Sequence, residues 1–332
     1  MYGRKFQRNQ FLYYQTPSPF DLPSLNESLY FPKVNESDND SMILHTNLLN
    51  SLYRKNTQLN PSNFEGFTLN ELVTKVTSII RHMMSAQNEF QAFRIKEILQ
   101  VGSFKNGTMR CGKNVADLLI LLDRVPTTML VQEMSVRMHA LLNDMQSVQI
   151  VPKCEYLSVE MTSKGLDIFN DSARVSVLIG TYPEYVIKIS EENLRTAVKH
   201  NIAAIQHSKF MEENSNPFAK ILSRVLKFII ERNEKLSAIN PWMIDAFACY
   251  SIFSNYLNQP LSLNQAFLRA FQLLSTGIFT ISYGVPDPCK NFQFSINHHL
   301  HVAEEKDIIE AAQGILNKIL DGKVDEVLEL SD

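Results

Sequence analysis

VGSFKNGTMRCGKNVADLLILL, residues 101–122, is the stretch that decides the fold. A turn at Gly102 and Ser103 is followed, after a gap of thirteen residues, by an apolar run around Asp117 that predicts a strand. Side chains of a strand alternate between its two faces, so Asp117 and Leu119 point the same way. Two carboxylates in that arrangement can hold two metal ions a few ångströms apart. Because position 119 is leucine, the second metal ligand is missing.

Two nearby positions do not replace the missing ligand. Asp123 lies on the same face of the predicted strand, but at about 3.3 Å per residue it is roughly 20 Å away. In the nucleotidyltransferase sites that this pattern resembles, a third carboxylate normally comes from a neighbouring strand. The best candidate for that strand is Arg174 to Ile179, and this run contains no acid. Two of three metal ligands are therefore missing, and two-metal phosphoryl transfer is expected to be lost.

These residues resemble the DZF domain (domain associated with zinc fingers), and within it the interleukin enhancer-binding factor 2 family. The resemblance continues through AAIQH (203–207), FMEEN (210–214), PWMID (241–245), QPLSLN (259–264) and DPC (287–289). It implies an α+β, nucleotidyltransferase-like bilobed fold, with an N-terminal mixed sheet with helices and a C-terminal all-helical lobe. Family members are catalytically inactive relatives of template-free nucleotidyltransferases. They pair with a larger DZF protein that carries double-stranded-RNA-binding or zinc-finger modules.

The resemblance thus implies a heterodimeric scaffold subunit that acts in RNA metabolism and transcription and meets RNA mainly through its partner. Its expected location is the nucleus, with the cytoplasm as a second compartment. Two alternatives stay open. One is a nucleotidyltransferase that is still active, or that binds nucleotide and magnesium without turnover through Gly102, Ser103 and Asp117. The other is a free-standing RNA-binding protein, although the sequence contains no RNA-binding module.

Composition agrees with an intracellular globular protein. The 332 residues are 45% hydrophobic and 20% charged, which is enough for a large core in one bilobed unit or two intimate domains. A net charge of -3 argues against a dominant nucleic-acid surface. No apolar run approaches the roughly 20 residues of a membrane helix, and the N-terminus lacks the core of a secretory signal. The four cysteines have no C-x-x-C spacing, and His298, His299 and His301 have no nearby cysteine, so no metal site is predicted.

Three regions are predicted along the chain: an N-terminal arm at 1–40, a nucleotidyltransferase-like lobe at 41–190 and a helical lobe at 191–332, the last carrying the heterodimer contact. The arm is rich in proline, asparagine and serine. Strands are predicted at 94–101, 114–122, 148–151, 157–161 and 175–179, and helices at 191–211, 217–234, 241–257, 262–280 and 304–321. Two earlier helices are predicted from apolar periodicity, the first capped by Asp40 or Ser41 and the second by Thr68 with Glu71.

Two sets of residues in the helical lobe are candidates for binding. Lys220, Arg224 and Lys227 lie on one side of the 217–234 helix, where they either contact RNA or simply keep a surface helix soluble. Two strongly apolar helices supply the candidate partner interface, whose residues are Phe267, Phe271, Leu274, Ile308, Ile309 and Ile315. The sequence alone does not separate interface from core. The same holds for Trp242, the only tryptophan, which is either a buried anchor or an interface residue.

Overall fold

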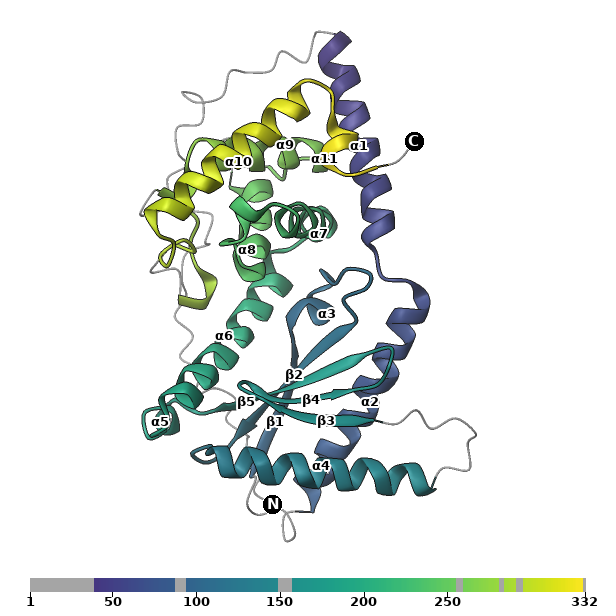
Figure 1. Ribbon diagram of the computed structural model, residues 1–332, viewed down its shortest axis with the longest axis vertical. Helices are drawn as coiled ribbons and strands as arrows, with labels where there is room; N and C mark the ends of the chain where they lie inside the picture. The colour runs from purple at the N-terminus through teal and green to yellow at the C-terminus, as the bar shows by residue number, and fades with distance from the viewer. Residues whose placement is uncertain are drawn as a thin grey trace, which may run out of the picture.

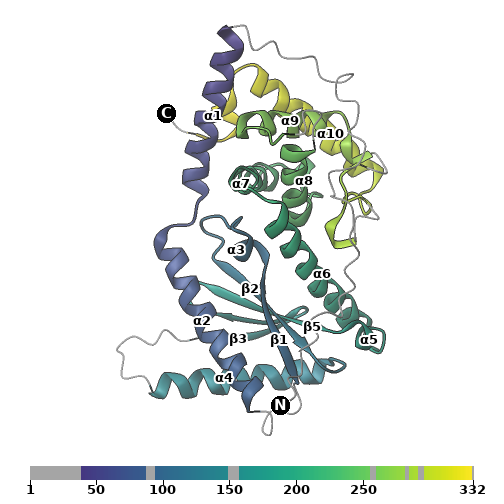
Figure 2. The same cartoon turned by 180° about the vertical axis from the view of Figure 1, so that it is seen from behind.

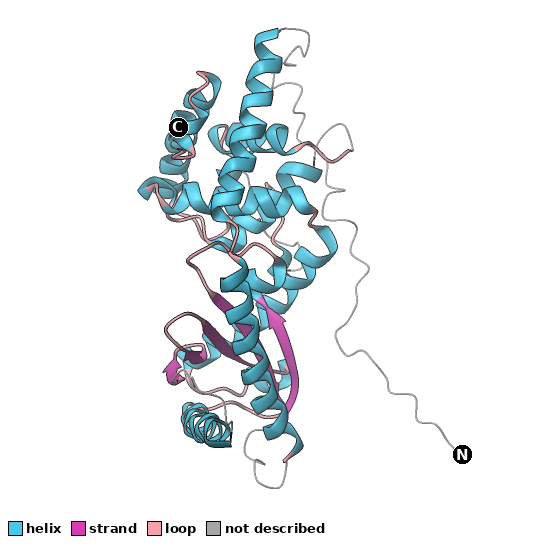
Figure 3. Cartoon of the chain, turned by 90° about the vertical axis from the view of Figure 1, so that its right-hand side faces the viewer, coloured by secondary structure: helices cyan, strands magenta, loops and turns pink. Residues whose placement is uncertain are grey.

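The protein has two lobes stacked along its long axis (Figure 1). The structure, a computed structural model, describes residues 39–86, 94–148, 157–254, 259–280, 284–290 and 295–330. Almost all of the predicted arm at 1–40 lies outside these ranges. Seen from the side, all the strands lie in one lobe and the other lobe is built of helices (Figure 3). No helix in the described ranges is long and apolar enough to cross a membrane.

One mixed sheet of five strands forms the centre of the first lobe. The strands are β1 (Ile95–Val101), β2 (Val115–Leu122), β3 (Ser158–Thr162), β4 (Gly165–Phe169) and β5 (Arg174–Thr181), in the order β1-β2-β5-β4-β3. β2 and β5 are parallel, and the other neighbours are antiparallel. The prediction missed β4. It was wrong at Val148, which ends helix α4; the rest of the predicted 148–151 strand lies outside the described residues.

Helices α2 (Asn63–Ser85) and α4 (Thr128–Val148) cover one face of the sheet (Figure 1). Their apolar residues meet the alternate side chains of β2 in a buried cluster. The predicted cap of α2 was wrong. Ser62 caps this helix, and Glu65 completes the capping box. Thr68 lies inside the helix, where the backbone amides already bond to helix carbonyls. Its hydroxyl instead donates to the Phe64 carbonyl at 2.9 Å.

The long helix α6 (Glu192–Asn214) crosses from the other face of the sheet to the helical lobe (Figure 2). Leu119 and Leu121 of β2 pack there against Ala204 of α6 and the side chain of Trp242. Two short helices complete this lobe, α3 (Gly102–Asn106) and α5 (Pro183–Val186). Because α6 contacts both lobes, it fixes the position of the sheet relative to the remaining helices.

The helical lobe contains α7 (Pro217–Glu231), α8 (Pro241–Phe253), α9 (Leu263–Ser275), α10 (Val302–Leu320) and α11 (Val324–Val327). Short 3-10 turns occupy Glu234–Leu236, Ile278–Thr280 and Pro288–Lys290. The first helix of the chain, α1 (Asn39–Leu59), also packs here. This differs from the expectation that 41–190 forms one lobe. Asp40 and Ser41 lie within the first turn of α1 rather than before it.

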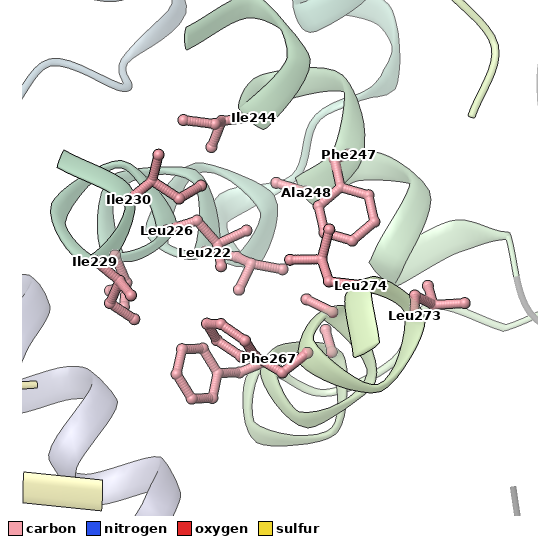
Figure 4. Close-up of a cluster of buried hydrophobic side chains, with 14 of the residues drawn as sticks. Leu222, Leu226, Ile229, Ile230, Ile244, Phe247, Ala248, Phe267, Leu273 and Leu274 are labelled. Atoms are coloured by element: carbon pink, nitrogen blue, oxygen red, sulfur yellow. The ribbon is translucent and has the colours of Figure 1, made fainter. Parts of the chain in front are cut away.

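The core of this lobe contains most of the predicted partner interface. Phe267, Phe271, Leu274 and Ile308 are at most 1% exposed and pack against the chain's own helices. Figure 4 shows Phe267 and Leu274 among side chains of α7 and α8. For these four residues the interface prediction was therefore wrong, because intramolecular packing already covers them. Ile309 and Ile315 are only half-buried.

Candidate functional site

A cleft of about 280 Å³ opens where the sheet meets α6 and the start of α8. Its walls come from the β1–α3 junction, β2, the β3–β4 turn, β5 and the two helices. The lining side chains that matter below are Gly102, Asp117, Lys164, Asp167, His200, Asn201 and Trp242. Of the predicted pocket residues, Gly102 and Asp117 line the cleft. Ser103 does not. It lies in α3, where its carbonyl accepts hydrogen bonds from the amides of Thr108 and Met109.

Gly102 allows the β1–α3 turn to approach Asp117 closely. Its φ is +76°, a conformation that other residues rarely adopt. A Cβ atom at this position would lie 2.0 Å from Oδ2 of Asp117, so only glycine leaves room for the carboxylate. The Gly102 amide donates to Ser208 Oγ of α6 at 3.2 Å. The glycine and aspartate that the sequence paired are thus in van der Waals contact.

The neighbouring strands show what surrounds Asp117. Leu119, two residues on, is completely buried and points into the cluster with Trp242. Ser176 of β5 lies in register beside Asp117, at the position from which a neighbouring strand would supply a third carboxylate. The described residues contain no group of three His, Cys, Asp or Glu side chains that can hold a metal ion.

Asp167 is an acid of this face that the sequence analysis missed. It lies on β4, in register with the same Ser176, so it is two strands away from Asp117. At about 4.8 Å per strand, the two backbones are roughly 10 Å apart. Ser176 Oγ donates to Asp167 at 2.7 Å, and Arg174 forms an ion pair with it at 3.3 Å. The Asp167 carboxylate is therefore already satisfied within the sheet.

Asp117, in contrast, has no hydrogen-bond donor and no ion pair among the described residues. Burial raises the pKa of its carboxyl from 3.8 to about 6. The positive charges of Lys164 and Arg174 act against this rise, and the negative charge of Asp167 adds to it. A half-buried carboxylate without a partner costs folding free energy when it is ionised, and such groups gather at functional sites.

Asn201 of α6 adds a second acceptor without a donor. Its side chain is completely buried, and Nδ2 donates to the carbonyls of Lys164 and Ile179, both at 2.8 Å. Two carbonyl acceptors at one end of the amide require the NH₂ group there, so the orientation of the amide is fixed. Oδ1 then receives no hydrogen bond from any residue that the structure describes. Asn201 and Asp117 line the same cleft.

Three stacked rings form the wall on the helical side. Trp242 lies between His200, with ring centroids 4.4 Å apart, and His207, with centroids 5.2 Å apart. His200 is the outermost ring of the stack, is exposed and lines the cleft. Its pKa is lowered, first by partial burial and then by the charge of Lys164, which favours the neutral ring. Trp242 is neither a fully buried anchor nor a surface residue, because it is half-buried between the two imidazoles.

The inner end of the stack leads to a buried ionic network. His207 contacts Asp245 of α8 at 3.2 Å, and Lys227 of α7 forms an ion pair with Asp245 at 2.6 Å. Lys227 also donates to Thr108 Oγ1 at 3.1 Å, in the turn that follows α3. Ser223 donates to the same carboxylate. The network therefore ties the turn of the first lobe to two helices of the second.

This network corrects the predicted basic patch. Lys227 is 6% exposed, and Arg224 is 9% exposed, with its guanidinium on Asn56 Oδ1 at 3.0 Å and on the Gly107 carbonyl at 2.6 Å. Neither residue faces solvent, so neither the RNA-contact nor the soluble-surface interpretation holds for them. Of the three predicted residues, only Lys220 is not buried. The polar side of α7 instead holds the two lobes together.

The fold is similar to that of known nucleotidyltransferase structures. CdnC of E. coli MS115-1, solved with ATP, is 14% identical with a TM-score of 0.56, covering 84% of this chain and 97% of CdnC. Cid1 in complex with its short product ApU is 10% identical with a TM-score of 0.55, covering 83% and 94%. A cytoplasmic RNA terminal U-transferase is 10% identical with a TM-score of 0.55, covering 86% and 98%. At these identities the likeness establishes the nucleotidyltransferase-like bilobed α+β fold alone.

The family assignment comes from the sequence of both lobes. The DZF N-terminal domain matches residues 4–216, and the DZF C-terminal domain matches residues 218–332. The boundary between them falls at the turn between α6 and α7. With the glycine turn, the lone Asp117 and the helical lobe all inside these matches, the chain belongs to the family of DZF-domain proteins.

Proposed function

We propose that this DZF protein is a catalytically inactive subunit of the interleukin enhancer-binding factor 2 type. The observation that carries the proposal is the register of the sheet at Asp117. Serine stands at the in-register position on β5, and a completely buried leucine stands two residues on. Two-metal phosphoryl transfer needs carboxylates that converge on both ions. Asp117 has no such partner among the described residues.

The subunit acts as a scaffold that heterodimerises with a larger DZF protein carrying double-stranded-RNA-binding or zinc-finger modules. In this proposal it stabilises that partner and takes part in nuclear RNA metabolism and transcription regulation, with RNA bound mainly by the partner. The surface that supports heterodimerisation is the flank of α10. Ile309 and Ile315 are half-buried there, and Leu320 is 53% exposed. Apolar side chains left open on a helix suit an obligate interface.

The alternative is a nucleotidyltransferase that is still active, with Asp167 as the second acid. This residue is the one acid of β3, β4 or β5 that lines the cleft. The distance of two strands and its bonds to Ser176 and Arg174 count against it. A primer-extension assay separates the two readings. The purified chain is incubated with magnesium or manganese, each nucleoside triphosphate and a single-stranded RNA primer, and we expect no added nucleotide.

Two variants sharpen this assay. Leu119→Asp restores one ligand position only and is expected to give no extension, because position 176 is still serine. Asp167→Asn is the control for the alternative. Extension by the natural chain that disappears in Asp167→Asn would overturn the proposed loss of catalysis.

Partner binding is tested by co-expression with a DZF protein that bears double-stranded-RNA-binding domains, followed by size-exclusion chromatography with light scattering. We expect a one-to-one complex. Leu320→Asp on α10 should weaken it, whereas Phe64→Asp, an even more exposed apolar position on α2 of the other lobe, should not. A soluble monomer that ignores the partner, or equal loss in both variants, would count against the proposal.

A further inference from the structure

Two hydrogen-bond acceptors in the cleft at Asp117 have no donor among the described residues. They are the Asp117 carboxylate and Asn201 Oδ1, which belongs to a completely buried side chain. Two neighbouring polar groups of the wall are engaged elsewhere. The Asn201 NH₂ group is used on two carbonyls, and the Ser176 hydroxyl donates to Asp167. A ligand that completes this site must bring N–H or O–H donors.

The lining of the cleft also offers few cations to an anionic ligand. Among its lining residues, Asp117 and Asp167 are acidic, and Lys164, which is exposed, is the basic one. A triphosphate carries several negative charges and needs converging cations or backbone amides. The amide of Gly102, which lies at this turn, is already used on Ser208. The cleft volume of about 280 Å³ is at the lower end for ligand pockets.

A flat cation fits the remaining wall. His200 is exposed and neutral, and its ring is the outer face of the stack with Trp242 and His207. A guanidinium group is planar, stacks on aromatic rings, and offers five N–H donors in a fixed fork. One edge of the fork suits a carboxylate, and a further N–H remains for an amide oxygen. An ammonium group is a compact point charge and has no plane that can stack on the ring.

We infer that the cleft between β2 and α6 is a binding site for a guanidinium group, which pairs with Asp117, donates to Asn201 Oδ1 and stacks on His200. The inference rests on the proposed loss of catalysis, since it gives the cleft a ligand of opposite charge to a nucleotide. The guanidinium comes either from a small molecule or from an arginine side chain of a polypeptide.

The only tryptophan of the chain reports on this site directly. Trp242 lines the cleft, so its fluorescence changes when a ligand stacks against the three rings. The full-length protein is titrated at pH 7.5 with arginine methylamide, and separately with the blocked peptide acetyl-Gly-Arg-Gly-amide. We expect a saturable change with both probes if the source is a polypeptide, and with arginine methylamide alone if it is a small molecule. Lysine methylamide should bind at least tenfold more weakly.

A matched pair of variants tests the role of Asp117. Asp117→Asn keeps the shape of the side chain and removes its charge, and we expect binding to weaken at least tenfold. Asp123→Asn, at the end of the same strand and paired with Lys96 at the surface, is the control and should bind normally. Asp117→Asn relieves a buried charge, so it is expected to fold, which circular dichroism checks. Isothermal calorimetry provides an independent affinity.

Three results would overturn the inference: no saturable change with either arginine probe, equal binding by Asp117→Asn, or displacement of the arginine probe by magnesium-UTP. Failure of the proposed function has a different signature, because it appears as primer extension by the natural chain. If the chain shows neither primer extension nor arginine binding, the guanidinium site is contradicted and the proposed function stands. Primer extension without arginine binding would contradict both the guanidinium site and the proposed loss of catalysis.

Discussion

Two carboxylates at the junction of the lobes, the half-buried Asp117 and the fully buried Asp245, have opposite environments. Asp245 receives an ion pair from Lys227, a contact from His207 and a hydrogen bond from Ser223. Burial alone would raise its pKa, but Lys227 and His207 outweigh burial and hold the pKa well below its ordinary value. Asp117 has no such partner, and burial raises its pKa to about 6.

The difference separates a structural acid from a candidate functional one. Asp245 stabilises the contact between α7, α8 and the turn at Thr108, so the fold gains from its charge. Asp117 is held ionised at a cost at neutral pH, and the rest of the protein must offset this cost. Substitutions at the two positions should therefore change stability in opposite directions.

The largest effect is expected for Asp245→Ala. It leaves the Lys227 ammonium buried without its counter-ion, which typically costs about 3–5 kcal/mol. The free energy of unfolding from urea titration measures the loss. Asp123→Ala, at a partly exposed ion pair, is the control and should cost less than about 1 kcal/mol. A loss for Asp245→Ala no larger than that of the control would show that the network does not stabilise the lobe junction.

Gly102→Ala comes next, with an expected loss of about 2–3 kcal/mol. The new Cβ would meet Asp117 Oδ2 at 2.0 Å, and the positive φ is unfavourable for alanine. The double variant with Asp117→Ala removes the clash and leaves the backbone strain, so it should recover part of the loss. Unfolding of both variants measures the coupling energy. If the two substitutions are simply additive, Gly102 and Asp117 are not in contact.

Asp117→Asn should stabilise the protein at pH 7.5 by about 1–3 kcal/mol, since a pKa difference of one unit corresponds to about 1.4 kcal/mol. The folded pKa of about 6 is above the ordinary 3.8, so the folded protein holds the proton more tightly than the unfolded chain. The penalty is absent below about pH 4, grows as the pH rises to 6, and is complete above it. Asparagine mimics the protonated acid without titrating.

Melting temperatures of the two proteins at pH 4 and pH 7.5 check this sign. The substitution leaves Lys164, Asp167, Arg174 and His200 in place around position 117, so the difference between the proteins isolates one carboxyl group. A gain that is equal at both pH values would contradict the raised pKa.

The sequence was informative where chemistry depends on local spacing. Gly102, Asp117 and Leu119 could be assigned because a turn and a strand period fix their relation within one segment. The lack of an acid opposite Asp117 followed from an acid-free run, whereas the register that places Ser176 there came from the structure. Asp167 was missed because β4 is a short strand of a hairpin, and its pairing with β5 depends on tertiary register rather than on the local pattern.

In the helical lobe, the sequence could not predict which residues become buried by tertiary contacts. Periodicity placed Arg224 and Lys227 on one side of α7 correctly, yet it could not tell what would cover that side. The Gly107 carbonyl, Thr108 and Asp245 come from distant parts of the chain and convert an expected surface stripe into a buried junction. Phe267 and Ile308 were assigned to an interface for the same reason. An apolar helix face indicates burial but does not name the partner.

The smallest effect is expected at Lys105 and Glu212, the ion pair that joins α3 to α6 at the surface. Its atoms are 3.9 Å apart, and both side chains are largely exposed. Exposed pairs contribute little because water screens the charges and two flexible side chains must be ordered. Lys105→Ala should therefore change the free energy of unfolding by less than about 0.5 kcal/mol in urea titration. Because this pair and the Asp245 network both join the lobes, a large loss at Lys105 would mean that surface charge, rather than the buried junction, holds the two lobes together.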